Sequence, residues 1–84
     1  MSYDDLINSA AQKYGIDPST LKRFVQIESG GNPRAVTGQY SGLLQLSRPE
    51  FESRGGTNIY DPEQNLNVGA AKLAQESAAF AQRY

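Results

Sequence analysis

Hydrophobic side chains recur every three or four positions along three stretches of the chain, which is the spacing of one face of an α-helix. The first stretch ends before Gly15, the second follows Asp17-Pro18, and the third and longest follows Asp61-Pro62. The positions predicted to be buried are Leu6, Ile7, Ala10, Ala11 and Tyr14 in the first, Leu21, Phe24 and Val25 in the second, and Leu66, Gly69, Ala70, Leu73, Ser77, Phe80 and Tyr84 in the third. No stretch alternates with a period of two, so the pattern predicts an all-α fold.

Helix starts are marked by residues whose side chains can accept from the first free backbone N–H groups. Asp17 and Asp61 each precede a proline, which suits the first helical position because that position needs no N–H. Capping boxes are predicted for Ser2 with Asp5, for Ser47 with Glu50, and for Asp61 with Gln64. We therefore expect about four helices, ending at Gly15, at Gly30, at about Ser53 and near the C-terminus, with a loop from Gly30 to about Tyr40. The apolar segment 42–46 is too short for its type to be predicted.

The composition narrows the possible chemistry. The 84 residues contain no histidine and no cysteine, which excludes Ser-His-Asp and Cys-His catalysis and nearly every zinc hydrolase. No short run alternates Asp and Asn around a glycine as calcium sites do, so we expect neither a metal nor a cofactor. Any catalysis must then rest on carboxylates, Lys, Tyr, hydroxyls or the backbone.

The charge balance bears on partners and location. A net charge of −1 gives no basic excess for binding nucleic acid or an anionic membrane. No apolar stretch is long enough for insertion across a bilayer, and the polar, acidic start differs from a secretory signal. Any action outside the cytoplasm would therefore need another route of export.

Glu28 interrupts the apolar face of the second predicted helix. It follows Leu21, Phe24 and Val25 by seven, four and three positions, which places its carboxyl on the face expected to pack inward. Burial of a carboxylate is costly unless the group is paired or takes up a proton, and a protonated acid is what a glycosidic oxygen needs as its donor. The alternative is a surface glutamate in the last turn that faces water or bonds a nearby amide.

Three sequence blocks follow one another in order: ESGGNP at 28–33, GLLQL at 42–46 and DPEQNLNVGA at 61–70. Together they resemble the soluble lytic transglycosylase family, whose catalytic domain is similar to goose-type lysozyme. The resemblance covers roughly residues 5–75 and implies a lysozyme-like helical domain. The chain departs from the family pattern before the second block, where Tyr40-Ser41 replaces the usual Gly-Ala in a shorter loop, and at Leu44, where Met is usual.

The resemblance assigns roles to matching residues. Glu28 matches the catalytic acid and base, and Gln45 matches a glutamine that lines the cleft beside the scissile bond. Thr37 stands where the family has a serine near the N-acetyl group of the substrate. Ser29 matches a residue that shapes the helix end and is expected to contribute to substrate binding. Tyr40 could stack on a sugar or fill the core of its loop.

The family's third motif, Tyr-Asn-Ala-Gly or a relative, does not occur before the chain ends at Tyr84. We therefore expect residues 1–84 to be the N-terminal and central part of the domain, with the far wall of the cleft missing. Apolar surface around Leu73, Phe80 and Tyr84 would then be covered by a C-terminal continuation or by an assembly partner. The isolated chain would be weakly active or inactive.

The expected function is a lytic transglycosylase that cuts the MurNAc-β-1,4-GlcNAc bond of peptidoglycan glycan strands and leaves 1,6-anhydromuramyl ends, with Glu28 acting first as acid and then as base. A hydrolysing muramidase is one alternative, and it would need a second carboxylate from Glu50, Glu52 or Asp61. Another is a non-catalytic glycan-binding or structural module of a phage or cell-wall assembly. The place of action would be the periplasm or cell wall, reached as a phage virion or lysis protein, as a domain of a larger protein or through a secretion system.

Overall fold

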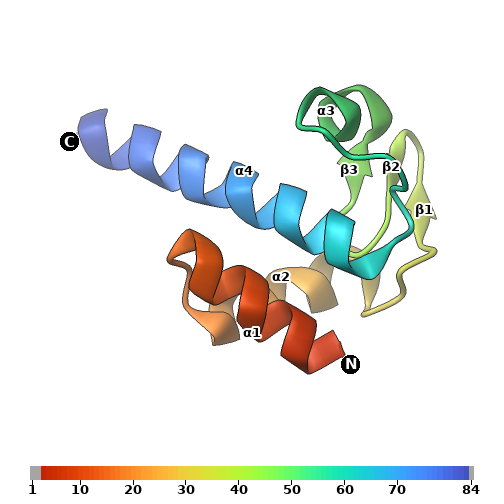
Figure 1. Cartoon of the computed structure of the whole chain (residues 1–84), viewed down its shortest axis with the longest axis horizontal. Helices are drawn as coiled ribbons and strands as arrows, with labels where there is room; N and C mark the ends of the chain where they lie inside the picture. The colour runs from red at the N-terminus through yellow and green to blue at the C-terminus, as the bar shows by residue number, and fades with distance from the viewer. Residues whose placement is uncertain (1–2, 84) are drawn as a thin grey trace.

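The computed structural model describes the backbone of residues 3–83 and the side chains of residues 3–76. Within that part of the chain, the helices are α1 (Tyr3–Tyr14), α2 (Pro18–Ser29), α3 (Arg48–Ser53) and α4 (Pro62–Arg83), and the strands are β1 (Val36–Thr37), β2 (Tyr40–Ser41) and β3 (Leu46–Ser47). Helix α4 packs beside α1, and its C-terminal end projects away from the sheet and from α3 (Figure 1). No described helix is both long enough and apolar enough to cross a membrane.

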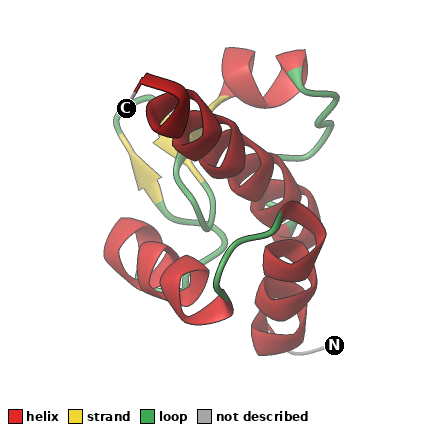
Figure 2. Ribbon diagram, turned by 90° about the vertical axis from the view of Figure 1, so that its left-hand side faces the viewer, coloured by secondary structure: helices red, strands yellow, loops and turns green. Residues whose placement is uncertain are grey.

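The predicted all-α class is confirmed in that helices dominate the described chain. The sequence did not predict the small antiparallel sheet, which has the strand order β1-β2-β3 and lies between α2 and α3 (Figure 2). Within it, Tyr40 pairs with Thr37 on one side and with Ser47 on the other. Each strand has two residues, which is too short for an alternating pattern to show in the sequence.

Side-chain caps place three helix starts where the sequence predicts them. The caps are Asp17 Oδ1 accepting from Ser19 N at 2.9 Å, Ser47 Oγ accepting from Glu50 N at 3.4 Å, and Asp61 Oδ2 accepting from Gln64 N at 3.2 Å. The cap predicted at Ser2 lies outside the described residues. These starts are local events, so a short stretch of sequence suffices to predict them.

The predicted capping box at the start of α4 is only half formed. The sequence predicts that the Gln64 side chain reaches back to the cap, but its Oε1 instead accepts from the backbone N–H groups of Thr57 and Asn58 at 2.8 and 3.2 Å. The N–H of Asp61 is already satisfied because it donates to Asn58 O at 3.0 Å. Gln64 therefore ties the preceding turn to α4.

Two clusters of buried side chains hold these elements together. The larger cluster consists of Ile7, Ala10, Ala11, Leu21, Val25, Leu43, Leu44, Leu66 and Ala70, and the smaller of Leu46, Phe51, Ile59 and Val68. Helix α4 contributes to both clusters, so it connects the helical part to the sheet and α3. Leu73 is half-buried against the larger cluster. The remaining positions of the predicted α4 stripe, at Ser77, Phe80 and Tyr84, fall outside the described side chains.

Candidate active site

Glu28 lies in the last turn of α2, and its side chain is exposed. The prediction that it packs inward is therefore wrong. The buried positions of α2 are Leu21 and Val25, four residues apart, whereas Phe24, also predicted to be buried, is 37% exposed. The stripe that meets the core is thus narrower than the sequence pattern implies, and Phe24 and Glu28 lie beside it. Burial in the free chain therefore does not support the predicted role of Glu28 as an acid.

The turn that follows Glu28 is closely hydrogen-bonded. Ser29 Oγ donates to Val25 O at 3.0 Å and accepts from Gly31 N at 3.2 Å. Gly30 ends the helix with φ 62°, in the left-handed region that glycine adopts most readily. The half-buried Ser29 side chain thus positions the helix end, and it is not among the described residues that line the pockets around Glu28. A direct contact between Ser29 and substrate stays a prediction.

Gln45 combines a strained backbone with an unsatisfied side-chain oxygen. Its φ is 51°, in the left-handed region that costs a residue with a Cβ about 1–2 kcal/mol. Its Nε2 donates to Ala35 O and to Gly42 O, both at 2.9 Å, which fixes the orientation of the amide. Its Oε1 is buried and has no hydrogen-bond partner within the described chain. Strain and an orphaned acceptor in one residue are typical of functional sites.

Asn65 of α4 holds the Gln45 segment in place. It is fully buried, its Oδ1 accepts from Leu44 N at 2.8 Å, and its Nδ2 donates to Ile59 O at 2.9 Å and to Ser41 O at 3.2 Å. Gly42 has φ 87°, and a Cβ at that position would collide with the Asn65 side chain. The sequence contains Asn65 within its third block, but nothing in the pattern predicts that one amide bonds three separate backbone groups.

Two adjoining pockets meet at Glu28 and Gln45, and together we call them the groove. The first, of about 200 Å³, is lined by Glu28, Thr37, Tyr40 and Gln45. The second, of about 170 Å³, is lined by Phe24, Glu28, Leu44, Gln45, Leu46, Gly69, Lys72, Leu73 and Glu76. The structure therefore brings together four of the five residues predicted for the site, whereas Ser29 lines neither pocket of the groove. Their roles in catalysis and binding stay predictions.

Tyr40 and Thr37 reach the groove from paired positions of the hairpin formed by β1 and β2. Both side chains are exposed, so Tyr40 does not fill the core of its loop. The Tyr40 hydroxyl accepts from Gln39 Nε2 at 3.0 Å, which restrains the ring at the rim. Of the two roles considered for Tyr40, its exposure favours contact with a ligand in the groove.

The second carboxylate of the groove comes from a residue that the sequence analysis missed. Glu50, Glu52 and Asp61 line neither pocket of the groove, whereas Glu76 does. Lys72 lies beside it, with Nζ 3.1 Å from Glu50 Oε1 and 4.0 Å from Glu76 Oε1. Gly69 precedes Lys72 and Glu76 by three and seven positions, and this helical spacing could have placed all three on one face of α4.

Hollows larger than the groove lie elsewhere in the molecule. One of about 490 Å³ lies between the end of α1, the turn after α3 and α4, and another of about 490 Å³ lies behind the sheet. Neither contains Glu28 or Gln45. We assign the candidate active site to the smaller groove because it joins a carboxyl group, an orphaned acceptor and exposed hydroxyls, which the larger hollows do not.

Comparisons with known proteins identify the family of this chain. The family model described as the transglycosylase SLT domain matches residues 5–84. The chain is 43% identical over 72 residues to a transglycosylase of Enterobacteria phage PRD1, which covers 84% of the chain and 27% of that protein. It is 37% identical over 84 residues to the membrane-bound lytic murein transglycosylase C of Photorhabdus laumondii, an alignment that covers 86% of the chain and 24% of that protein. It is 36% identical over 84 residues to the protein of the same name from Edwardsiella ictaluri, with 86% of the chain and 23% of that protein covered.

The chain spans about a quarter of the length of these curated relatives. The family model, by contrast, covers nearly all of the chain and includes every residue of the groove. This chain belongs to the transglycosylase SLT domain family.

Proposed function

We propose that this chain cleaves the MurNAc-β-1,4-GlcNAc bond of peptidoglycan glycan strands as a lytic transglycosylase, with Glu28 as the catalytic acid and base. The observation that carries the proposal is the groove itself, where Glu28 and Gln45 line both pockets. Membership of the transglycosylase SLT domain family supports the reaction class, and relatives named lytic murein transglycosylase support the substrate class.

The proposed reaction needs one carboxyl group. Glu28 gives its proton to the glycosidic oxygen as the bond from that oxygen to muramyl C1 breaks. The resulting carboxylate then takes the proton of the muramyl C6 hydroxyl, and the freed oxygen bonds to C1 and closes the 1,6-anhydro ring. The proton that Glu28 gives up leaves on the new hydroxyl of the departing GlcNAc, and the proton of the C6 hydroxyl replaces it, so Glu28 is regenerated and no water is consumed.

Gln45 is the proposed partner of this carboxyl group. Its Nε2 protons are held by two backbone carbonyls, which leaves the buried Oε1 as the only unused polar atom of the amide. That oxygen can accept from a protonated Glu28 carboxyl or from a hydroxyl or N-acetyl N–H of a sugar in the groove. Because Glu28 is exposed in the free chain, a glycan lying across it would have to displace the water around its carboxyl.

A hydrolysing muramidase is the second candidate, and the presence of Glu76 in the groove favours it. Hydrolysis by two carboxylates uses one as acid and the other as nucleophile or as the base that activates water. Lys72 Nζ lies 4.0 Å from Glu76 Oε1 and 3.1 Å from Glu50 Oε1, so both carboxylates have a cationic neighbour. Among the described residues, no ion pair within 4.0 Å involves Glu28.

We further propose that residues 1–84 form the N-terminal and central part of a catalytic domain that works in the periplasm or cell wall. The relative from a bacteriophage supports an origin in a phage virion or lysis protein, and the longer relatives support a domain of a larger protein. A non-catalytic glycan-binding module is the remaining alternative, and the absence of cleavage by the intact domain would favour it.

The test is to incubate purified peptidoglycan with a complete catalytic domain that contains residues 1–84 and with its two isosteric variants, Glu28→Gln and Glu76→Gln, and to quantify released fragments by mass spectrometry. We expect Glu28→Gln to lose about 10²–10⁴-fold in rate, the usual contribution of a general acid and base, and Glu76→Gln to keep most of it. Circular dichroism should show that both variants are folded, because both changes are exposed and isosteric. Activity that survives in Glu28→Gln and is lost in Glu76→Gln would contradict the proposal.

A further inference from the structure

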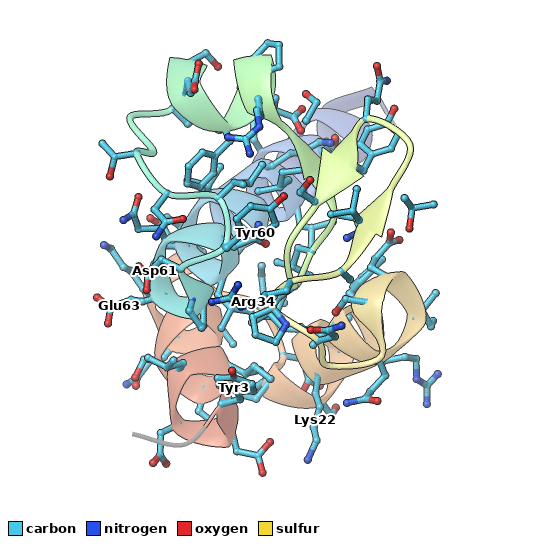
Figure 3. The ribbon with its side chains drawn as sticks, turned by 90° about the vertical axis from the view of Figure 1, so that its right-hand side faces the viewer. Tyr3, Lys22, Arg34, Tyr60, Asp61 and Glu63 are labelled. Carbon is cyan, nitrogen blue, oxygen red and sulfur yellow. The ribbon has the colours of Figure 1, made fainter. Side chains whose placement is uncertain are left out.

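One of the two larger hollows outside the groove lies behind the sheet, and we call it the hairpin pocket. It has a volume of about 490 Å³, and its lining includes Val36, Gln39, Ser41, Ser47, Arg48 and Tyr60. Tyr60 lies between the sheet and the start of α4 (Figure 3). The pocket therefore has walls from the hairpin, from the first turn of α3 and from the loop before α4, and none of the residues that line it takes part in the proposed reaction.

Arg48 is the one charged side chain among the described residues that line this pocket. Its Cζ lies 5.7 Å from the centre of the Tyr60 ring, within the range of a cation–π contact. The ion pairs found within 4.0 Å in the described chain are all made by Lys22 and Lys72, so none of them occupies the Arg48 guanidinium. A planar cation is thus held at the pocket without a carboxylate partner.

The platform under Arg48 is itself fixed. Tyr60 packs against the smaller core cluster, and its backbone N–H donates to Asn58 Oδ1 at 3.1 Å. A guanidinium stacked on a fixed ring loses less conformational freedom when it binds than one on a free side chain. Its fork of N–H donors matches the two oxygens of a carboxylate. The amide of Gln39 and the hydroxyl of Ser47 add neutral polar groups suited to a peptide backbone.

The hairpin pocket and the groove share the β1–β2 hairpin. The cross-strand pair Thr37 and Tyr40 lines the groove, whereas the pair Val36 and Ser41 lines the hairpin pocket. Gln39 connects the two sites, because it lines the hairpin pocket and its Nε2 donates to the Tyr40 hydroxyl at 3.0 Å. A ligand that follows the groove past Tyr40 therefore meets the hairpin, with Arg48 on its other side.

We infer that the hairpin pocket binds a carboxylate-bearing peptide, and that its source is the peptide stem attached to the glycan in the groove. The carboxylate chemistry follows from Arg48 and Tyr60 alone. The choice of the stem as its source rests on the proposed function, since peptidoglycan is a glycan whose muramyl units carry short acidic peptides. A phosphate-rich polymer is disfavoured because the pocket holds a single cation and the whole chain has a net charge of −1.

The experiment is an NMR titration of the ¹⁵N-labelled chain with an N-acetylated alanyl-γ-glutamate peptide, and with the same peptide carrying amides in place of its carboxylates. We expect the acid to shift the amide signals of Val36, Gly38 and Gln39, and the amidated peptide to leave them in place. Arg48→Gln should weaken binding about tenfold or more, since a hydrogen bond to a charged group is worth roughly that factor. Arg23→Gln is the matched control, because Arg23 lies on α2 outside the hairpin pocket and its loss should leave binding unchanged.

A parallel titration with a β-1,4-linked N-acetylglucosamine tetramer, which has no carboxylate, separates this inference from the proposed function. We expect that glycan to shift Thr37, Tyr40 and Gln45, and Arg48→Gln to leave those shifts intact. Peptide binding without glycan binding would uphold the pocket and count against the proposed function. Glycan binding together with any one of three results would overturn the inference: equal shifts from acid and amide, acid binding that survives Arg48→Gln, or equal shifts from inorganic phosphate.

Discussion

The two sides of the groove are built in opposite ways. On one side, Leu43, Leu44 and Leu46 are buried, Asn65 pins the segment 42–46, and Gln45 has a strained backbone conformation. On the other, the end of α2 leaves Glu28 exposed and Ile27 71% exposed. The described chain therefore fixes the proposed acceptor by its own packing. It leaves the proposed acid to be enclosed by whatever binds in the groove.

The largest expected effect on stability comes from breaking the pinned side at Asn65. The near-isosteric change Asn65→Leu leaves Leu44 N and Ile59 O without their partner, at about 1–3 kcal/mol for each group, and removes a further hydrogen bond to Ser41 O. Small domains are stable by only about 5–15 kcal/mol, so the variant should be largely or wholly unfolded in chemical denaturation followed by circular dichroism.

Asn67→Leu is the matched control on the same helix. Asn67 is half-buried and bonds only Glu63 O, through an exposed contact at 2.8 Å, so its loss should cost less than about 1 kcal/mol. Equal stabilities for the two leucine variants would show that the pin does not hold the segment.

The next effect comes from the close approach at Gly42. In Gly42→Ala the new methyl group would collide with the Asn65 side chain, and the backbone would keep its φ of 87°. We expect a loss of about 2–4 kcal/mol, the sum of overpacking and of a left-handed alanine. Gly38→Ala has φ 60° with nothing near its Cβ, so only the smaller backbone cost should appear in its denaturation curve. A larger loss in Gly38→Ala would contradict this account of Gly42.

Truncations within α2 sharpen the contrast between its buried stripe and its exposed edge. Leu21 is fully buried, so Leu21→Ala should cost about 2–5 kcal/mol in the free energy of unfolding. From the sequence alone, Phe24→Ala is predicted to cost as much. With Phe24 37% exposed, we now expect about 1 kcal/mol or less. Equal losses at the two positions would restore the wider stripe that the sequence pattern implies.

The smallest effect is a pH dependence at the start of α2. Hydrogen bonds from the hydroxyl and the backbone N–H of Ser19 hold the pKa of Asp17 below its ordinary value. The cap is therefore strongest when Asp17 is ionised, above the pKa of an unfolded aspartate, and it weakens as the pH falls through the lower pKa of the folded state. Asp17→Asn should remove this part of the acid dependence of the melting temperature. An unchanged acid limb in that variant would contradict the assignment.

The parts of the structure that the sequence predicts are those decided by neighbours along the chain. Asp17, Ser47 and Asp61 cap helices as predicted, because a cap needs only the residues that follow it within one turn. The side chains of Gln64 and Glu50 were not predictable in this way. Each finds a partner elsewhere, in the turn before α4 and at Lys72 respectively.

The candidate site was predictable as a set of residues and less so as a geometry. Two of the sequence blocks contain Glu28 and Gln45, the loop between these blocks contains Thr37 and Tyr40, and the structure places these four residues around one pocket. The exposure of Glu28 depends on how α2 is rotated against the core, which periodicity does not fix to within one residue. The presence of Lys72 and Glu76 in the groove depends on the packing of α4 against the Gln45 segment, which no local pattern encodes.

The central claim is that Glu28 is the one catalytic carboxyl group and that the muramyl C6 hydroxyl, not water, attacks muramyl C1. The most direct measurement is mass spectrometry of muropeptides released in water enriched in the heavy oxygen isotope. We predict products that carry no heavy oxygen and that are lighter than the hydrolysed fragments by one water molecule, because the 1,6-anhydro ring takes its oxygen from the sugar. A main product with heavy oxygen at muramyl C1 would contradict the account. If that product disappeared in Glu76→Gln, Glu76 would be the second catalytic carboxylate.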